Sequence, residues 1–163
     1  MAFGLRWPKS LNMEAFIERL LTASRKTLFR TKAIFEPYRA VEESDIAAIE
    51  CIVAVSLPRS LRQWLLRAGF GDLNGELSFR AEWFSVIDRG QLQGHVIFAQ
   101  DQSGNFYAFS PSSGIIHFID RSAPEYAEIA GNFEEFMEGF ESHGFELQDW
   151  TNSLDALPYD WTV

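Results

Sequence analysis

The stretch His95–Ile119, HVIFAQDQSGNFYAFSPSSGIIHFI, decides the fold of this chain. It holds three short runs rich in β-branched and aromatic residues, a composition that favours strands: Val96–Gln100, Asn105–Phe109 and Ile115–Ile119. The segments between the runs, DQSG and SPSSG, consist of turn-forming residues. Three strands joined by tight turns predict an antiparallel meander.

Both faces of this meander are apolar. Successive side chains of a strand point to opposite faces, so Phe106 and Ala108 share one face while Tyr107 and Phe109 share the other. We therefore expect a central sheet that is covered at least partly on each side. Such a stretch is part of a core and not an active site.

Length and composition indicate one globular domain. The chain has 163 residues, of which 47% are hydrophobic, and its 15 Phe and 5 Trp supply a large buried area. No apolar run approaches the roughly 20 residues of a membrane-spanning helix, and no apolar signal-peptide core follows the N-terminus. The single Cys51 lies in an apolar helical pattern, which predicts a buried thiol. We expect a cytoplasmic protein that makes no membrane contact.

The net charge of −9 is unevenly distributed. Residues 1–40 hold eight Lys or Arg and three Asp or Glu, whereas residues 41–163 hold six Arg and twenty acids. An acidic body argues against direct nucleic-acid binding, which requires cations to neutralise phosphates. It is compatible with a basic protein surface as partner, although an acidic surface that merely keeps the protein soluble is the alternative.

The N-terminal 40 residues are predicted to form a basic helical arm. Residues 11–32 show an apolar stripe that extends to Leu28, with basic residues elsewhere. A basic amphipathic helix can lie on a membrane or a partner, but packing of the stripe on its own domain is the commoner arrangement. Pro37 ends this segment, and residues 36–41 are expected to be a linker.

Two helices and two strands are predicted between the arm and the meander. The first helix begins with Ser44 as N-cap, and the second begins after Pro58 and ends at Gly69. Candidate strands follow at residues 77–80 and 83–87.

A last helix and an aromatic tail follow the meander. Asn132 and Glu135 form a capping-box pattern, and the apolar residues Phe133, Phe136, Met137 and Phe140 line one side of the helix that they start. Residues 142–163 are acidic and contain four aromatic residues, so we expect this tail to dock against the domain.

No pattern requires an enzyme. His143 and Glu146 have a spacing that could chelate a metal, but the intervening glycine disfavours the helix that this would need. Asp88, Asp101 and Asp120 lie at strand ends, where carboxylates sometimes form acid–base pairs and more often form turns. An enzyme remains an alternative, but we expect no catalytic residues, no metal and no cofactor.

Three segments of the chain resemble motifs of the SUKH superfamily. The first comprises Ile46–Glu50, Leu57-Pro58, Leu61, Trp64–Leu66 and Gly69–Gly71; the second comprises Phe98–Asp101 and Gly104–Tyr107; the third is Ile129–Met137. Together they cover about residues 41–141, which we take as a SUKH-like domain. The resemblance assigns structural roles to Leu57, Pro58, Trp64, Leu65, Gly69, Asp101, Gly104, Asn105, Tyr107 and Phe133.

The resemblance also implies a fold and a function. The SUKH fold is α+β, a twisted, mostly antiparallel sheet with helices packed against it. Members include fungal cell-wall-synthesis regulators and bacterial immunity proteins. The resemblance therefore implies a cytoplasmic immunity protein of a polymorphic toxin system, which binds and neutralises a cognate toxin domain by direct contact. A non-catalytic scaffold or signalling adaptor is the alternative.

The acidic body suggests how such a protein could act. A toxin directed at nucleic acid needs a basic cleft, and an acidic surface could occupy that cleft in place of phosphates. We expect the partner-binding residues among the acids of the last helix and the tail, namely Glu134, Glu138, Asp149, Asp155 and Asp160. The alternative is that these acids form a solvated surface.

Overall fold

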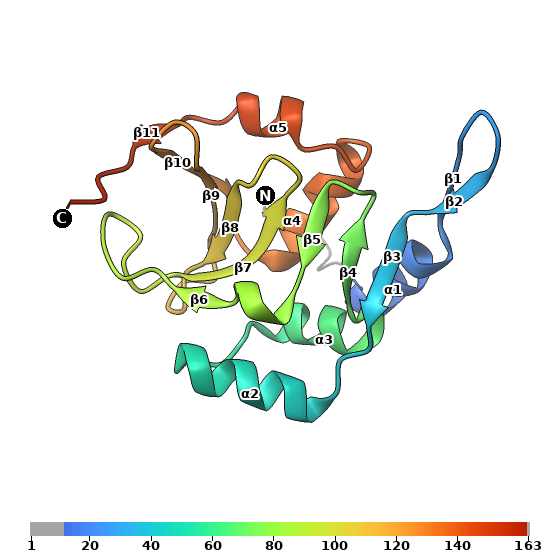
Figure 1. Ribbon diagram of the computed structural model, residues 1–163, viewed down its shortest axis with the longest axis horizontal. Coiled ribbons are helices and arrows are strands. Elements are labelled where there is room, and N and C mark those ends of the chain that lie inside the picture. Colours follow the sequence, from blue (N-terminus) through green and yellow to red (C-terminus); the bar gives the residue numbers. More distant parts are fainter. Residues whose placement is uncertain (1–11, 163) are drawn as a thin grey trace, which may run out of the picture.

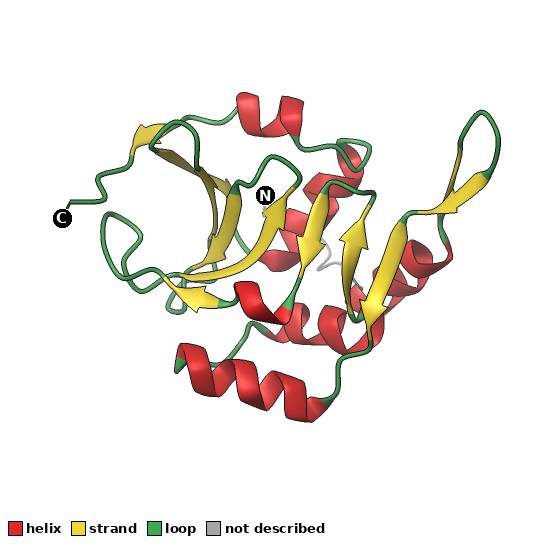
Figure 2. Cartoon of the chain, viewed as in Figure 1, coloured by secondary structure: helices red, strands yellow, loops and turns green. Residues whose placement is uncertain are grey.

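A computed structural model describes residues 12–162 and shows an α+β fold, in which helices pack against a large antiparallel sheet (Figures 1 and 2). The helices are α1 (Met13–Thr22), α2 (Glu43–Val53), α3 (Arg59–Ala68), α4 (Phe133–Ser142) and α5 (Gln148–Asn152), with a 3₁₀ turn, η1, at Ala81–Trp83. The nine-stranded sheet has the order β11-β10-β9-β8-β7-β5-β4-β3, with β6 paired to β7. The predicted fold class is confirmed.

The central meander lies where the sequence predicts it. It consists of β7 (Val96–Asp101), β8 (Phe106–Phe109) and β9 (Ile116–Asp120), and β10 (Glu125–Ala130) pairs antiparallel with β9. Tyr107 and Phe109 belong to the main core. Ala108 and Phe106 belong to a second cluster on the other face, which Tyr159 of the tail helps to cover. The prediction that this sheet is covered on both faces is thus confirmed.

The main core is rich in aromatic residues from both the sheet and the helices. Trp64 of α3 lies against Phe79 of β5 (Leu77–Phe79), with ring centroids 5.8 Å apart, and Phe79 is followed by Phe98 of β7 at 6.3 Å. Phe133 and Phe136 of α4 contact Phe98 edge-on at 5.7 and 5.9 Å. All five side chains are fully buried. Edge-to-face contacts of this kind stabilise a core beyond the area that they bury.

The prediction of one helix over residues 11–32 is wrong. Leu11 lies outside the described residues, α1 ends at Thr22, and residues 24–33 form a hairpin of β1 (Ser24–Lys26) and β2 (Thr31–Ala33). The Thr27 amide and hydroxyl both donate to the Arg30 carbonyl, at 2.8 and 2.7 Å, and close the turn. Thr and Ser form such local bonds at the expense of helix. Leu28 therefore lies outside the apolar stripe, and its side chain is 90% exposed.

The expected linker over residues 36–41 is also wrong in its larger part, because β3 (Phe35–Arg39) is the edge strand of the sheet. It pairs antiparallel with β4 (Phe70–Leu73). Pro37 is tolerated here because an edge strand leaves one side of its backbone without a partner, so the missing N–H is not needed.

Two details of α2 differ from expectation. Its N-cap is Glu42 and not Ser44, and the Asp45 carboxylate accepts from the Glu42 amide at 2.8 Å. Cys51 is exposed and not buried, because the buried stripe of α2 runs through Ile46, Ile49 and Val53 and leaves Cys51 on the outer side.

The predicted strand over residues 83–87 is limited to β6 (Ser85–Val86), which follows η1.

The C-terminus of α3 and the N-terminus of α4 form as predicted. Gly69 ends α3 with a positive φ of 86°, and a Cβ there would lie 2.5 Å from the Arg39 carbonyl oxygen. The Asn132 side chain accepts from the Glu135 amide at 2.8 Å. The Glu135 carboxylate bonds the amide of Gly131, one residue before the N-cap, at 3.0 Å.

The C-terminal segment runs back over the body. Trp150 of α5 stacks on Phe136 at 5.7 Å and on His143 at 4.8 Å between ring centroids. β11 (Leu157–Pro158) pairs with the start of β10. The Tyr159 hydroxyl donates to the Arg89 carbonyl at 2.6 Å.

Candidate partner-binding site

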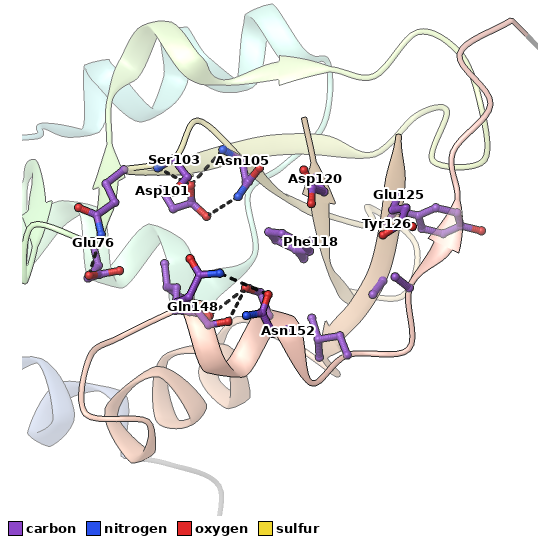
Figure 3. Close-up of a pocket in the computed structure, with 16 residues that line it drawn as sticks. Glu76, Asp101, Ser103, Asn105, Phe118, Asp120, Glu125, Tyr126, Gln148 and Asn152 are labelled. Carbon is purple, nitrogen blue, oxygen red and sulfur yellow. Dashed lines mark hydrogen bonds between the residues drawn. The ribbon is translucent and has the colours of Figure 1, made fainter. Parts of the chain in front are cut away.

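A polar pocket of about 200 Å³ opens at the end of the meander, between the sheet and α5 (Figure 3). Its walls come from the β4–β5 turn, the β7–β8 turn, the end of β9, the start of β10 and one side of α5. The labelled residues in Figure 3 are Glu76, Asp101, Ser103, Asn105, Phe118, Asp120, Glu125, Tyr126, Gln148 and Asn152. Four of these residues are acids, and the side chains that line the pocket include no Lys, Arg or His.

Asp101 holds the β7–β8 turn in shape. Its Oδ1 accepts from the amides of Ser103 and Asn105, both at 3.0 Å. Its Oδ2 accepts from Asn105 Nδ2 at 3.2 Å and from the Tyr107 hydroxyl at 2.9 Å. Because it accepts four hydrogen bonds from its own surroundings, this carboxylate stabilises the turn and does not serve to bind a ligand.

Asp120 plays the same part in the turn between β9 and β10. Its Oδ1 accepts from the Ser122 amide and hydroxyl, both at 2.9 Å, and from the Ala123 amide at 3.1 Å. Partial burial alone would raise the pKa of Asp120, but the hydrogen bonds from Ala123 and Ser122 outweigh it, and the pKa lies below its usual value. Asp120 is therefore ionised at neutral pH.

Glu76 and Glu125 differ from these two aspartates because they close no turn with their side chains. Glu76 accepts from Gln102 Nε2 at 2.9 Å, and Glu125 is exposed at the start of β10. Partial burial of Glu76, together with the neighbouring charges of Glu146 and Asp101, raises its pKa. A cation bound in the pocket would relieve this repulsion. The chemistry that the pocket offers is thus acceptance of a positively charged group.

Within residues 12–162, no group of three or more His, Cys, Asp or Glu side chains is arranged to hold a metal ion.

The five acids predicted as the binding face lie on different elements. Glu134 and Glu138 are on α4, and Asp149 is on α5 beside Gln148 of the pocket. Asp155 lies between Leu154 and Ala156, which both line the pocket. Asp160 bonds the Thr162 amide at 2.8 Å and lies beyond β11. Asp149 and Asp155 are thus next in sequence to pocket residues, whereas the other three are not.

Glu76 and Glu125 were not predicted from the sequence. They are 49 positions apart and come from a turn and from the first residue of a strand. The Asn74-Gly75 sequence predicts a turn next to Glu76. No local pattern indicates that Glu76 lines the same pocket as the start of β10.

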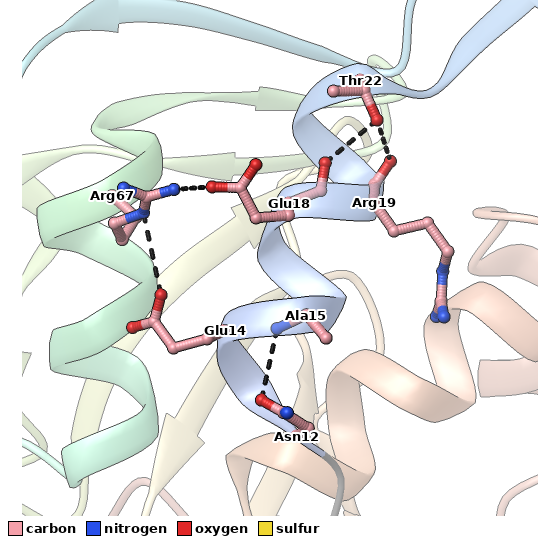
Figure 4. A network of polar contacts seen from close by, with 7 residues as sticks. All are labelled: Asn12, Glu14, Ala15, Glu18, Arg19, Thr22 and Arg67. Atoms are coloured by element: carbon pink, nitrogen blue, oxygen red, sulfur yellow. Dashed lines mark hydrogen bonds and ion pairs between the residues drawn. The ribbon is translucent and has the colours of Figure 1, made fainter.

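Ion pairs join α1 to the body (Figure 4). Arg67 of α3 bonds Glu18 and lies 3.9 Å from a Glu14 carboxylate oxygen, and both acids are on α1. On another side of α1, Arg19 pairs with Glu141 of α4 at 2.7 Å. These exposed pairs fix the orientation of α1 more than they stabilise the fold, since exposed ion pairs contribute little.

The family-motif residues are mostly structural in position. Leu57, Trp64, Leu65, Tyr107 and Phe133 are buried in the main core. Gly104 has a positive φ of 84° in the β7–β8 turn, where Asn105 bonds Asp101 and also accepts from the Arg121 amide at 3.1 Å.

Comparison with models of protein families identifies the family of this chain. A model of the SMI1 / KNR4 family (SUKH-1) matches residues 40–139, which is more than half of the chain. The chain belongs to this family, as its three sequence motifs predict. Membership is consistent with an immunity protein or an SMI1/KNR4-like regulator, and members are generally non-catalytic. Neither the curated proteins nor the solved structures yielded a match. Among the described helices, none has the length and apolar character needed to cross a membrane.

Proposed function

We propose that this chain is an immunity protein that binds a cognate bacterial toxin domain and neutralises it by direct contact. The proposal is supported by family membership together with one observation of the site. That observation is a pocket with four carboxylates and no basic side chain in its lining. A basic toxin surface offers the Lys or Arg side chains that such a pocket accepts.

The four carboxylates of the pocket have two different roles, and this difference makes the proposal specific. Asp101 and Asp120 hold the turns, so their removal would alter the fold as well as the charge. Glu76 and Glu125 carry the charge that a partner would meet. We expect E76Q/E125Q to fold normally and to weaken the toxin complex about tenfold, a typical size for the loss of interfacial charges.

The test is co-purification with the product of the gene immediately upstream, followed by measurement of the dissociation constant at increasing salt. A complex that weakens steeply with salt and is impaired in E76Q/E125Q supports the proposal. E82Q is the matched control, because Glu82 in η1 is exposed, forms no ion pair with a described residue and does not line this pocket. A tight complex indifferent to salt would retain immunity and remove the acidic-pocket mechanism. With no complex, a scaffold or adaptor role would become the better account.

A further inference from the structure

The hairpin of β1 and β2 projects from the body beside β3, at the opposite end of the sheet from β10 and β11 (Figure 1). Its tip carries Leu28 and Phe29, with side chains 90% and 92% exposed, the highest exposures among the large hydrophobic residues described. Two adjacent apolar side chains at this exposure lose stabilisation in water that burial elsewhere would provide. The tip therefore has the character of a contact site.

Every ionisable side chain of the hairpin is basic. Lys32 pairs with Glu36 at 2.9 Å, whereas Arg25, Lys26 and Arg30 form no ion pair with a described carboxylate. In the ladder, Arg25 lies opposite Lys32 and Lys26 lies opposite Thr31. Neighbours in a strand point to opposite faces, so Arg25 and Lys26 place positive charge on both faces of the ribbon behind the apolar tip.

This arrangement distinguishes a lipid surface from a protein surface. A flat protein surface would engage one face of the ribbon and leave the cations of the other face unused. A membrane interface surrounds an inserted tip, so cations on both faces lie level with anionic headgroups while the apolar residues enter the acyl boundary. We propose that the β1–β2 hairpin is a peripheral anchor for an anionic membrane surface, with Leu28 and Phe29 inserted and Arg25, Lys26 and Arg30 at the headgroups.

The acidic body does not prevent this contact. At about 3.3 Å per residue, the hairpin tip lies roughly 15 Å beyond its base. The repulsion between the acidic body and the membrane is screened over the Debye length of about 8 Å at physiological ionic strength, and the four basic side chains of the hairpin lie between the body and the inserted tip. The sequence-based expectation of no membrane contact rests on the lack of a membrane-spanning run and of a signal-peptide core, and neither bears on an exposed apolar hairpin tip.

The test is flotation of the full chain with vesicles of phosphatidylcholine and phosphatidylglycerol, and with vesicles of phosphatidylcholine alone. We expect binding to the anionic vesicles that high salt abolishes, and little binding to the neutral ones. L28S/F29S should lower binding at least about tenfold. R25Q/K26Q/R30Q should lower it on the order of a hundredfold, because each of the three cations near an anionic surface is worth about fivefold in affinity.

The matched control is I52S, which makes the same apolar-to-polar change at a side chain of α2 that is 74% exposed. It should bind like the unmodified chain. Absence of binding to anionic vesicles overturns the proposal, as does binding that L28S/F29S leaves unchanged. If vesicles are not bound and L28S/F29S instead weakens the toxin complex, the hairpin is a protein contact and the lipid proposal is wrong.

Discussion

The hydroxyl of Tyr107, a side chain with no exposed surface, donates a 2.9 Å hydrogen bond to the carboxylate of Asp101 at the β7–β8 turn. This bond joins the core of the sheet to the rim of the acidic pocket. Burial, reinforced by the charge of Asp101 and the hydrogen bond to it, raises the pKa of Tyr107 well above its usual value, so the phenol stays protonated and remains a donor.

The first prediction concerns this bond. D101A would leave the Tyr107 hydroxyl buried without an acceptor and would release the amides of Ser103 and Asn105. We expect a loss of about 2–3 kcal/mol in the free energy of unfolding, measured by urea denaturation. D155A removes an exposed carboxylate that accepts no hydrogen bond from a described residue and should change stability by less than about 0.5 kcal/mol. Equal stability of the two variants would show that Asp101 does not hold the turn.

The second prediction concerns the docking of α5 on α4. A Cβ at Gly139 would lie 2.6 Å from the Trp150 ring, which is held between Phe136 and His143. We expect G139A to displace Trp150 and to cost about 1–3 kcal/mol, although alanine favours helix over glycine. G144A is not a suitable control, because Gly144 has a positive φ of 68°. W150A combined with G139A is suitable, since without the Trp150 ring the added methyl should no longer destabilise.

The third prediction concerns pH. His117 packs edge-on against His95, with ring centroids 5.1 Å apart, and Nδ1 of each ring is buried without a partner among the described residues. Burial, and then the charge of His95, lower the pKa of His117 to about 4. Since this pKa lies below that of the unfolded chain, about 6.5, the contribution of His117 to stability is present above pH 6.5 and is lost as the pH falls towards 4.

The free energy of unfolding of the unmodified chain should fall by roughly 2 kcal/mol over this pH range because of His117, and this fall should be absent in H117Q. The measurement is the free energy of unfolding of both proteins between pH 7 and about pH 4.5, where ordinary carboxylates still contribute equally to each. Parallel curves for the two proteins would contradict the assigned burial of His117.

The fourth prediction separates the acids proposed from the sequence. If the binding surface is centred on the pocket, alanine at Asp149 and Asp155 should weaken the toxin complex, whereas alanine at Glu134, Glu138 and Asp160 should change it little. Titration of each set against the toxin at low salt measures the difference. Unchanged affinity and salt dependence with all five replaced would exclude these acids from the interface.

The parts of the fold that local patterns encode were predictable. The meander combines period-two alternation with two turn sequences, and the stripe of α4 follows a capping pattern at Asn132. In both cases the signal and the structure lie within one stretch of about 25 residues or fewer.

The N-terminal segment was not predictable in the same way. Leu28 continues the spacing of the α1 stripe, so the sequence alone cannot separate a longer helix from a helix followed by a hairpin. The turn hydrogen bonds of Thr27 decide for the hairpin. Pro37 is likewise a strand residue only because β3 lies at the sheet edge, which depends on the pairing of distant strands.

The site depends still more on tertiary structure. Asp101 is marked by its own turn, but its association with Glu76, Asp120 and Glu125 follows from the order of strands and from α5 closing over them. One sequence carries no signal for such an arrangement.

The most direct test of immunity is protection of growth. The upstream gene product is expressed from an inducible promoter in cells that contain this chain, E76Q/E125Q, E82Q or no immunity gene. We predict that the chain and E82Q restore growth, that E76Q/E125Q protects less, and that cells without the gene die. Equal killing in all four strains, with every protein produced and folded, would contradict the proposed function.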